Sequence, residues 1–576
     1  MRRVVLVAVL LLACGGRTPD PAPVPADPTW PLAGRAPRAE SPHGMVVSGH
    51  PLASAAGARV LERGGNAIDA AVAVGFALAA VLPEAGNIGG GGFLVYRDAG
   101  GDVLALDYRE RAPGLASRDM FLDENGQPTE KSVIGHLAAG VPGAVAGLRA
   151  MHDRLGSLPW SDLVQPAVEL ARGHEVDEVR SRHLAAAAAR LSRFPASASQ
   201  FLPGGVPPSP GASWSQPDLA ATLERIASDG AEGFYGGRTA ALVVDEMRLG
   251  GGLISGSDLA EYRAVWRDPI VAEYRGYTVY SMPPPSSGGV TLALLLNMLE
   301  GYSPLPPHGS ADLAHVHAEV MRRAFIDRNR HLGDPDFVEM PLERLASQEY
   351  ADGLRSEIDL ERATPTPPFL GGGAEGENTT HYSVVDRHGN AAAITTTINS
   401  AFGSAVTVTG AGFLLNNEMD DFAAAPGKPN QFGLVEGELN AVAPGKRMLS
   451  SMTPSVVLAP GGELELVLGS PGGPTIITTV FQVISNVLDH GTTLEAAIES
   501  PRMHHQAWPD LISFEPGSFD VATQEALRAR GHELTEREGW SGDVSAVALC
   551  SGTLAGVADP RRGGAPVGAA APEGSP

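Results

Sequence analysis

Residues 379–404 read TTHYSVVDRHGNAAAITTTINSAFGS. Two runs rich in β-branched and small residues flank the short polar turn at 387–390 (RHGN). β-Branched residues fit a pleated surface, and two such runs around a glycine-containing turn are typical of a β-hairpin. We therefore predict strand, turn and strand here. Hairpin partners lie roughly 5 Å apart, so contact between Thr379 and Thr397 on the paired strands is plausible.

The segment before this hairpin has a different character. Residues 363–378 (ATPTPPFLGGGAEGEN) hold three prolines and four glycines and show no apolar period, which is typical of a loop. A threonine hydroxyl is a poor nucleophile near neutral pH and needs a base within hydrogen-bond reach. The α-amine at a chain start, with a pKa of about 7.7–8.0, is such a base. Thr379 gains it only if the bond to Asn378 is cleaved, and from the residues alone β-propensity is the plainer explanation of a threonine pair.

The rest of the chain reads as alternating strands and helices. Helices are expected at 51–63, 66–80, 143–155, 160–172, 219–228, 289–299, 311–328 and from 475 onward, and strands at 45–48, 93–96, 274–282, 455–458 and 464–468. No unit of 20–50 residues repeats, which excludes solenoids and propellers. The pattern predicts an α/β (α+β) protein, as one composite fold or two domains.

Composition narrows the possible functions. The 576 residues are 43% hydrophobic and 19% charged, a globular balance with ample material for a core. The formal net charge of −24 repels phosphates, so a nucleic-acid partner is not expected. Two cysteines, Cys14 and Cys550, are too few for a disulfide framework, and no zinc-type spacing occurs. We expect no metal and no cofactor.

The N-terminus resembles an export signal. Arg2 and Arg3 precede the apolar run 4–12, which is too short to span a bilayer, and Cys14 follows in a sequence similar to a bacterial lipobox. We interpret 1–14 as a lipoprotein-type signal with Cys14 as the lipidation site; an ordinary secretory signal is the alternative. Residues 15–43 are rich in Pro and Ala and are expected to form a tether. The protein is then exported, in the periplasm or on an unspecified bacterial membrane.

Motifs in order along the chain resemble the γ-glutamyltransferase family, of the N-terminal nucleophile hydrolases. They are RGGNAIDAAVA (63–73), GNIGGGGF (86–93), LDYRERAP (106–113), YRGYTVYSMPPPSSGG (274–289), LGDPDF (332–337), TTHYSVVDRHGNAAAITTTINSAFGS (379–404), LLNNEMDDF (414–422), KRMLSSMTPS (446–455) and GSPGGPTIITTV (469–480). The resemblance implies a four-layer αββα sandwich built from two chains cut from one precursor. These are a large subunit, 44–378, and a small catalytic subunit, 379–576, which form a heterodimer.

The resemblance also implies the activity and the residues that carry it. The enzyme would transfer the γ-glutamyl group of glutathione or other γ-glutamyl amides to water, an amino acid or a dipeptide. Thr379 would be the nucleophile and the start of the small subunit, Thr397 its polarising partner, and Gly472 and Gly473 the oxyanion donors. The substrate carboxylate would pair with Arg109, Ser450 and Ser451, and its ammonium with Asn399, Glu418 and Asp421.

Without the resemblance, most of these residues have plainer interpretations. Arg109 would be a surface charge, the pair at 420–421 a cap or turn, and the serine pair a turn. The glycine run 89–92 favours close backbone packing over phosphate binding, since no Gly-Lys-Ser/Thr follows. His504 and His505 are adjacent and point apart, which makes a poor metal pair.

One residue departs from the family pattern, and two alternative functions remain open. Phe432 stands where bacterial relatives often have tyrosine in a lid, and loss of that hydroxyl favours hydrolysis over transfer. Asp421 favours γ-glutamyl substrates over those of glutaryl- or cephalosporin-type acylases, the nearest alternative. An inactive, lipid-anchored binding protein is the alternative from another class.

Overall fold

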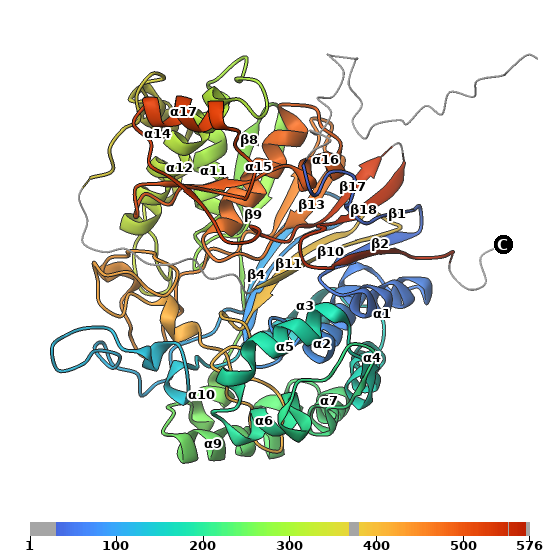
Figure 1. Cartoon of the computed structure of the whole chain (residues 1–576). Coiled ribbons are helices and arrows are strands. Elements are labelled where there is room, and N and C mark those ends of the chain that lie inside the picture. Colours follow the sequence, from blue (N-terminus) through green and yellow to red (C-terminus); the bar gives the residue numbers. More distant parts are fainter. Residues whose placement is uncertain (1–29, 368–378, 551, 572–576) are drawn as a thin grey trace, which may run out of the picture.

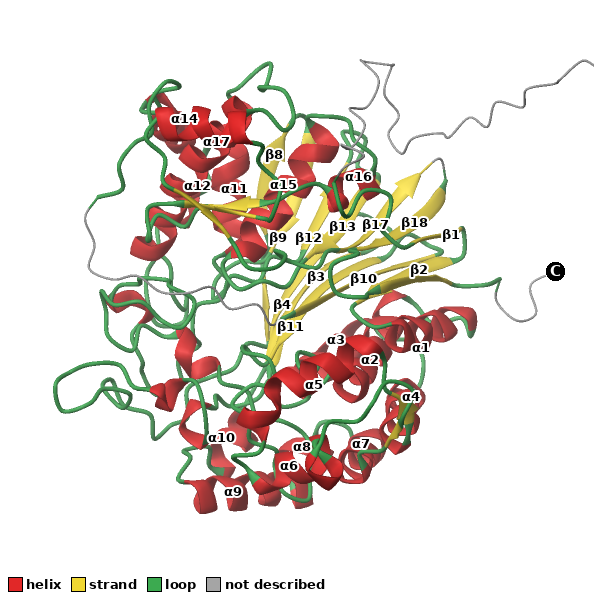
Figure 2. Ribbon diagram, in the orientation of Figure 1, coloured by secondary structure: helices red, strands yellow, loops and turns green. Residues whose placement is uncertain are grey.

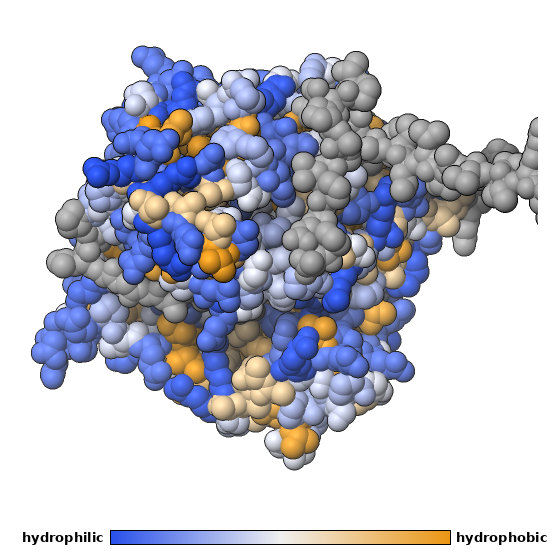
Figure 3. Space-filling model, turned by 45° about the horizontal axis from the view of Figure 1, so that its top comes forward, coloured by the Kyte–Doolittle hydropathy of each residue, from blue (hydrophilic) through white to orange (hydrophobic). Residues whose placement is uncertain are grey.

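The computed structural model describes residues 30–367, 379–550 and 552–571. Two seven-stranded antiparallel sheets lie face to face at the centre, and helices cover the outer face of each (Figure 1, Figure 2). This is the αββα sandwich that the resemblance implies. Hydrophilic residues dominate the face drawn in Figure 3, where apolar residues form small separate groups. Among the described residues, no helix is both long and apolar enough to cross a bilayer.

The first sheet contains the predicted hairpin and is called the hairpin sheet. Its strands, in spatial order, are β19 (Ala565–Gly568), β2 (Gly44–Ser48), β10 (Thr380–Asp386), β11 (Ala391–Thr397), β3 (Gly91–Arg97), β4 (Val103–Asp107) and β7 (Val265–Arg267). The second sheet runs β1 (Arg38–Ser41), β18 (Thr553–Ala558), β17 (Ser545–Cys550), β13 (Leu464–Gly469), β12 (Ser455–Leu458), β9 (Tyr277–Ser281) and β8 (Ile270–Tyr274).

The hairpin sits in the middle of its sheet. Thr380 pairs with Thr396 across β10 and β11, which confirms the predicted hairpin. β10 also pairs with β2, and β11 with β3, so strands from before residue 379 flank it on both sides. The two pieces of a chain cut before Thr379 would therefore stay joined by sheet hydrogen bonds and a shared core.

Helices form the two outer layers. Those of the hairpin-sheet side are α1 (Pro51–Glu62), α2 (Ala67–Val81), α3 (Ala144–Leu155), α4 (Trp160–Arg172), α5 (Glu178–Leu191), α6 (Pro195–Phe201), α7 (Pro217–Asp229), α8 (Glu232–Tyr235), α9 (Gly237–Gly250) and α10 (Gly256–Glu261). Those of the second-sheet side are α11 (Gly288–Glu300), α12 (Ala311–His331), α13 (Leu342–Leu345), α14 (Gln348–Ser356), α15 (Thr475–Leu488), α16 (Leu494–Glu499) and α17 (Val521–Ala529). Some helices, such as α2 and α11, pack on a sheet, and others, such as α7 and α9, pack on neighbouring helices.

Hydrophobic residues fill three layers of core. The Ala-rich helix α2 is buried along its whole length between the hairpin sheet and the outer helices. A second cluster joins α11, α12 and α15 to the second sheet, and a third fills the space between the two sheets. Both hairpin strands are buried along their length, which explains the small and β-branched residues of β11.

Two expectations are corrected. The tether predicted over 15–43 is too long, because Arg38–Ser41 forms β1 at the edge of the second sheet and the buried Trp30 indole donates to the Glu499 carbonyl at 2.7 Å. The single strand predicted over 274–282 is instead the hairpin β8–β9, since Arg275 and Gly276 turn with positive φ values of 53° and 81°. Cys14 and Asn378 lie outside the described residues.

Candidate active site

Thr379 stands at the start of β10, beside the end of β11. Its hydroxyl donates to Thr397 Oγ1 at 3.3 Å, and the backbone N–H of Asn399 donates to the same oxygen at 2.8 Å. Thr379 is 8% exposed, so the hydroxyl is largely shielded from solvent but open to a pocket. Asn399 adopts a positive φ of 71°, which turns the chain back after the strand so that this N–H reaches Thr397.

The glycine run before β3 allows the close packing that holds Thr397. Gly91 of β3 is the register partner of Thr397. A Cβ on Gly90 would lie 2.0 Å from the Thr397 carbonyl oxygen, and one on Gly89 would lie 2.1 Å from the Leu414 carbonyl oxygen. Any side chain there would push the two segments apart. The backbone-packing interpretation of this run is confirmed.

Arg109 follows β4 and is almost completely buried, with an exposed fraction of 1%. Its guanidinium forms an ion pair with Glu418 at 2.8 Å and another with Asp421, both on the single 3₁₀ turn Glu418–Asp421. The neighbouring Glu110 carboxylate lies 3.5 Å away. One cation therefore faces three carboxylates in a buried place, and the expectation of an exposed surface arginine fails.

This excess of acidic groups shifts their titration. Burial raises the pKa of Glu418 well above its ordinary value and raises that of Asp421, in both cases against the opposing charge of Arg109. Burial likewise raises the pKa of Glu110 to about 8. Three buried carboxylates cannot all ionise against one guanidinium without a further cation. The pocket is thus prepared for a positively charged group.

Ser450 and Ser451 line the same pocket and are fixed by residues far away in the sequence. The Ser287 hydroxyl and backbone N–H both donate to the Ser450 carbonyl, at 2.6 and 2.7 Å, and Ser286 donates to the Met452 carbonyl. These contacts explain the serine pair that directly precedes α11. The Ser450 hydroxyl also accepts from the Met452 backbone N–H at 3.1 Å, which is the local contact expected of a serine turn and which fixes this side chain.

A glycine pair ends the loop between β13 and α15. Gly472 and Gly473 have positive φ values of 137° and 54°, and a Cβ on Gly472 would lie 2.4 Å from the Thr475 hydroxyl. Among the described residues, neither glycine donates a backbone hydrogen bond. Two available N–H groups at the N-terminus of α15 form a positive end that suits an oxyanion.

These groups surround one pocket, called the main pocket, of about 370 Å³. Of the residues predicted from sequence, those lining it are Arg109, Thr379, Thr397, Asn399, Glu418, Asp421, Ser450, Ser451 and Gly473, and Gly472 adjoins it. Phe432 forms part of its wall within the loop 426–440, which is closed on itself by a bond from the Gly427 N–H to the Glu436 carbonyl.

Sequence reasoning missed a second buried arginine in this wall. Arg328 of α12 pairs with Glu436, and its Nε donates to the Ser287 hydroxyl at 3.2 Å. Its Nη2 also lies 3.5 Å from the Ser451 hydroxyl. The sequence alone does not distinguish Arg328 from Arg322 and Arg323 on the same helix, because all three are arginines among residues that turn out to be mostly buried.

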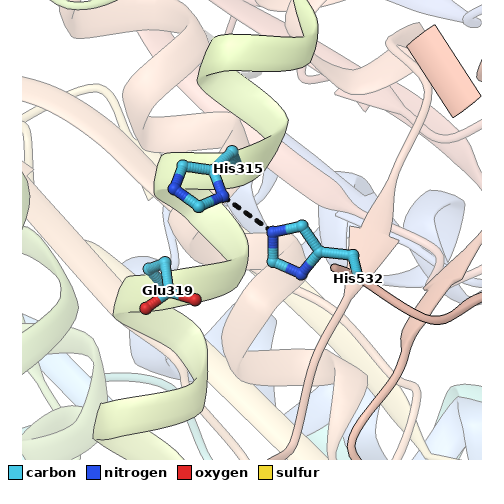
Figure 4. A group of neighbouring side chains, drawn as sticks. All are labelled: His315, Glu319 and His532. Atoms are coloured by element: carbon cyan, nitrogen blue, oxygen red, sulfur yellow. Dashed lines mark hydrogen bonds between the residues drawn. The ribbon is translucent and has the colours of Figure 1, made fainter. Parts of the chain in front are cut away.

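A separate cluster of two histidines and a carboxylate lies away from this pocket (Figure 4). His315 Nε2 donates to the Asp359 carbonyl, and His315 Nδ1 lies 2.7 Å from His532 Nε2. Glu319 accepts from the Thr364 backbone and hydroxyl, and it is also paired with Arg322 and Arg323. Two adjacent guanidinium groups oppose a bound cation, so we interpret the cluster as a structural anchor of α12.

Comparisons with known proteins agree with this geometry. A family model described as Gamma-glutamyltranspeptidase matches residues 53–569. The chain belongs to the gamma-glutamyltranspeptidase family. It is 43% identical over 574 residues to the glutathione hydrolase proenzyme of Escherichia coli, with 97% of each chain covered. It is also 40% identical over 558 residues to the Acylase ACY 1 proenzyme of a Pseudomonas strain, covering 95% of this chain and 97% of that one.

A solved structure supports the fold of this family member. The crystal structure of a cephalosporin acylase from Bacillus halodurans superposes with a TM-score of 0.82 at 28% identity, covering 94% of this chain and 99% of the other. Transpeptidases and acylases therefore share the αββα architecture. The shared fold does not separate the two activities, so the residues that line the pocket have to be compared. In this chain the feature to compare is the group of buried carboxylates around Arg109.

Proposed function

We propose that the chain is an autoprocessing γ-glutamyltransferase and glutathione hydrolase. The observation that carries this proposal is the position of the Thr379 hydroxyl, hydrogen-bonded to Thr397 at the edge of a pocket whose far side holds Arg109 between acidic groups. Cleavage of the bond before Thr379 frees an α-amine. The same residue then supplies both nucleophile and base, with no cofactor.

The first half-reaction is acylation of the threonine. Thr379 Oγ1 attacks the γ-carbonyl carbon, and its proton passes to the free α-amine. The backbone N–H groups of Gly472 and Gly473 stabilise the oxyanion of the tetrahedral intermediate. The C–N bond then breaks, the leaving amine takes a proton, and the γ-glutamyl group remains as a threonyl ester.

The second half-reaction returns the free enzyme. Water or the amine of an amino acid or peptide attacks the ester carbon and gives a proton to the α-amine of Thr379. The C–O bond to Thr379 then breaks, and the α-amine returns the proton to Thr379 Oγ1. Attack by water gives glutamate, and attack by an amine gives a new γ-glutamyl amide. Thr397, held by the Asn399 N–H, keeps the Thr379 hydroxyl oriented through both steps.

Recognition of the donor rests on an exchange of ion pairs. The α-carboxylate of the γ-glutamyl group binds the Arg109 guanidinium and the hydroxyls of Ser450 and Ser451. The α-ammonium then becomes the partner of Glu418 and Asp421, which pair with Arg109 in the absence of substrate. A substrate without the ammonium leaves these buried carboxylates unpaired, which is costly. This argument favours γ-glutamyl over glutaryl compounds.

An acylase activity is the second candidate, because the chain also resembles Acylase ACY 1 and the cephalosporin acylase. Purified protein should be compared on γ-glutamyl- and glutaryl-p-nitroanilide. The account expects kcat/KM to be at least 100-fold higher for the γ-glutamyl compound, equivalent to about 2.7 kcal/mol. A preference for the glutaryl compound would refute the transferase assignment, and failure to split either compound would favour an inactive binding protein.

We further propose that the protein is exported and anchored by a lipid on Cys14. Support comes from the sequence alone, in the short apolar run ending at this cysteine. When cells that express the natural chain are fed radiolabelled palmitate, the label should appear on the protein. The Cys14→Ala variant should carry no label. Unlabelled but exported protein would favour an ordinary secretory signal.

A further inference from the structure

The side chain of Asn87 contacts the strand end that carries Thr397. Asn87 belongs to the loop between α2 and β3 and is 7% exposed. Its Nδ2 donates to the Thr397 carbonyl at 3.0 Å and lies 3.3 Å from the Thr396 hydroxyl. Its Oδ1 accepts from the Gly90 backbone N–H at 2.9 Å. One amide therefore ties the glycine run 89–92 to the last two residues of β11.

Thr397 needs such support because it is the last residue of β11. Its register partner on β3 is Gly91, and the printed pairing with β10 begins one position further in, at Thr380 and Thr396. Beyond Thr397, the positive φ of Asn399 turns the chain away from the sheet. The amide of the loop thus supplies a hydrogen bond to the Thr397 carbonyl at the point where the strand ends.

The loop is shaped to hold this amide in one orientation. A Cβ on Gly90 would lie 2.8 Å from Asn87 Oδ1 and 2.0 Å from the Thr397 carbonyl oxygen, so a side chain there would displace both groups. Nδ2 also donates to the Ala85 carbonyl at 3.1 Å. Because one end of the amide meets an N–H and the other meets carbonyl oxygens, only one of its two orientations satisfies its neighbours.

Asn87 has no place in the wall of the main pocket. Among the residues that the structure describes, it lines a different cavity, of about 270 Å³, whose lining shares no residue with that of the main pocket. Thr397 does line the main pocket, and its Oγ1 accepts from the Thr379 hydroxyl. Asn87 is therefore joined to the proposed nucleophile through Thr397.

We infer that Asn87 is a positioning residue for the reaction: by fixing the Thr397 carbonyl, it holds the Thr397 hydroxyl where it orients that of Thr379. This inference rests on the proposed function and gives Asn87 no contact with the substrate. The hydrogen bond between the two hydroxyls is 3.3 Å long, which exceeds the usual length, so a small displacement of Thr397 breaks it. Such a displacement slows the chemical step without changing the groups that bind the γ-glutamyl substrate.

The substitution Asn87→Asp tests this inference because it removes only the N–H donor. The carboxylate still accepts from the Gly90 N–H but places an oxygen against the Thr397 carbonyl. With purified, cleaved enzyme and γ-glutamyl-p-nitroanilide, kcat should fall at least tenfold, equivalent to about 1.4 kcal/mol, while KM stays within twofold. A kcat within twofold of the wild type, or a KM that rises as much as kcat falls, would overturn the inference.

Asn297→Asp is the matched control. Asn297 on α11 is 4% exposed, and its Nδ2 donates to the Ala346 carbonyl at 2.8 Å, so the same change removes the same kind of bond at a residue that does not line the main pocket. This variant should have a lower thermal midpoint and a kcat within twofold of the wild type. A loss of kcat as large as that of Asn87→Asp would show that Asn87 has no specific positioning role.

A second variant decides the question if Asn87→Asp yields no folded, cleaved protein. The shorter side chain of Asn87→Ser cannot span the distance to the Thr397 carbonyl, so kcat should fall at least fivefold at unchanged KM. A kcat within twofold of the wild type would overturn the inference while the proposed function stands. Failure of the proposed function is seen separately, in a wild-type enzyme that does not split the substrate.

Discussion

Two buried arginines line the main pocket and differ in the charges around them. Arg328 forms its ion pair with one carboxylate, Glu436, and donates to neutral oxygens of Asn329, Ser287 and Ser451. Its charge also lowers the pKa of Asp421 from beyond ion-pair distance. Arg109 faces three carboxylates. A guanidinium paired with one carboxylate is electrically neutral, whereas a guanidinium beside three carboxylates leaves negative charge that a bound cation can neutralise. We therefore propose that Arg328 maintains the wall and that the acidic groups around Arg109 receive the substrate ammonium.

Replacing Arg109 tests the substrate side of this comparison and has the largest expected effect. Arg109→Lys keeps a positive charge but loses the forked geometry, and kcat/KM for γ-glutamyl-p-nitroanilide should fall about 10²–10³-fold, roughly 3–4 kcal/mol. The melting temperature should change little. A matched change on the surface, Arg118→Lys, should leave both unaffected. Full activity in Arg109→Lys would remove Arg109 from substrate binding.

Replacing Arg328 should act mainly on stability. Arg328→Met leaves Glu436 buried without its cation, which costs about 3 kcal/mol, and thermal denaturation should show a lower midpoint. The double variant Arg328→Met/Glu436→Gln should regain most of the loss, because both charges are then gone. Equal midpoints for the single variant and the wild type would show that the pair does not support the wall.

The excess of carboxylates also predicts a pH dependence. Burial raises the pKa of Glu110 from 4.5 to about 8. A raised folded-state pKa contributes stability that is fully present below pH 4.5 and is lost as pH rises through 8. Melting temperatures at pH 5, 6.5 and 8 should therefore decline less steeply in Glu110→Gln than in the wild type. The control Glu130→Gln, 74% exposed, should follow the wild-type slope.

The smallest effect is expected at the lid. Phe432 is held by a bond from its N–H to Asn430 and lacks a hydroxyl toward the pocket. Phe432→Tyr adds one hydrogen-bonding group, worth about 1 kcal/mol, and should raise the ratio of transfer to hydrolysis about two- to fivefold. Product analysis by chromatography with glycylglycine as acceptor measures this ratio. A lower ratio would contradict the expected role of the missing hydroxyl.

The local parts of this fold could be predicted from sequence. The hairpin β10–β11 spans 18 residues, from Thr380 to Thr397, and its β-branched runs and turn predict it. Helices such as α2 follow from a continuous apolar pattern. The turn at Arg275 and Gly276 was missed because alternating residues continue on both sides of it, although the glycine is itself a turn signal. The burial of Glu110 could not be predicted from the sequence, since it depends on strands and loops that are distant along the chain.

The site was recovered unevenly for the same reason. Residues in family motifs, such as Thr379 and Asp421, could be assigned roles by resemblance. Arg328 and Ser286 could not, because only tertiary packing brings α12 and the loop before α11 to the pocket wall.

The central claim is that Thr379 becomes a chain start and then acts as nucleophile. Intact mass and N-terminal sequencing of the purified protein test this most directly. We predict two tightly associated pieces, the smaller beginning Thr-Thr-His-Tyr, and a single uncleaved, inactive chain for Thr379→Ala. An uncut wild-type chain that still hydrolyses γ-glutamyl-p-nitroanilide, or an active Thr379→Ala variant, would contradict the account.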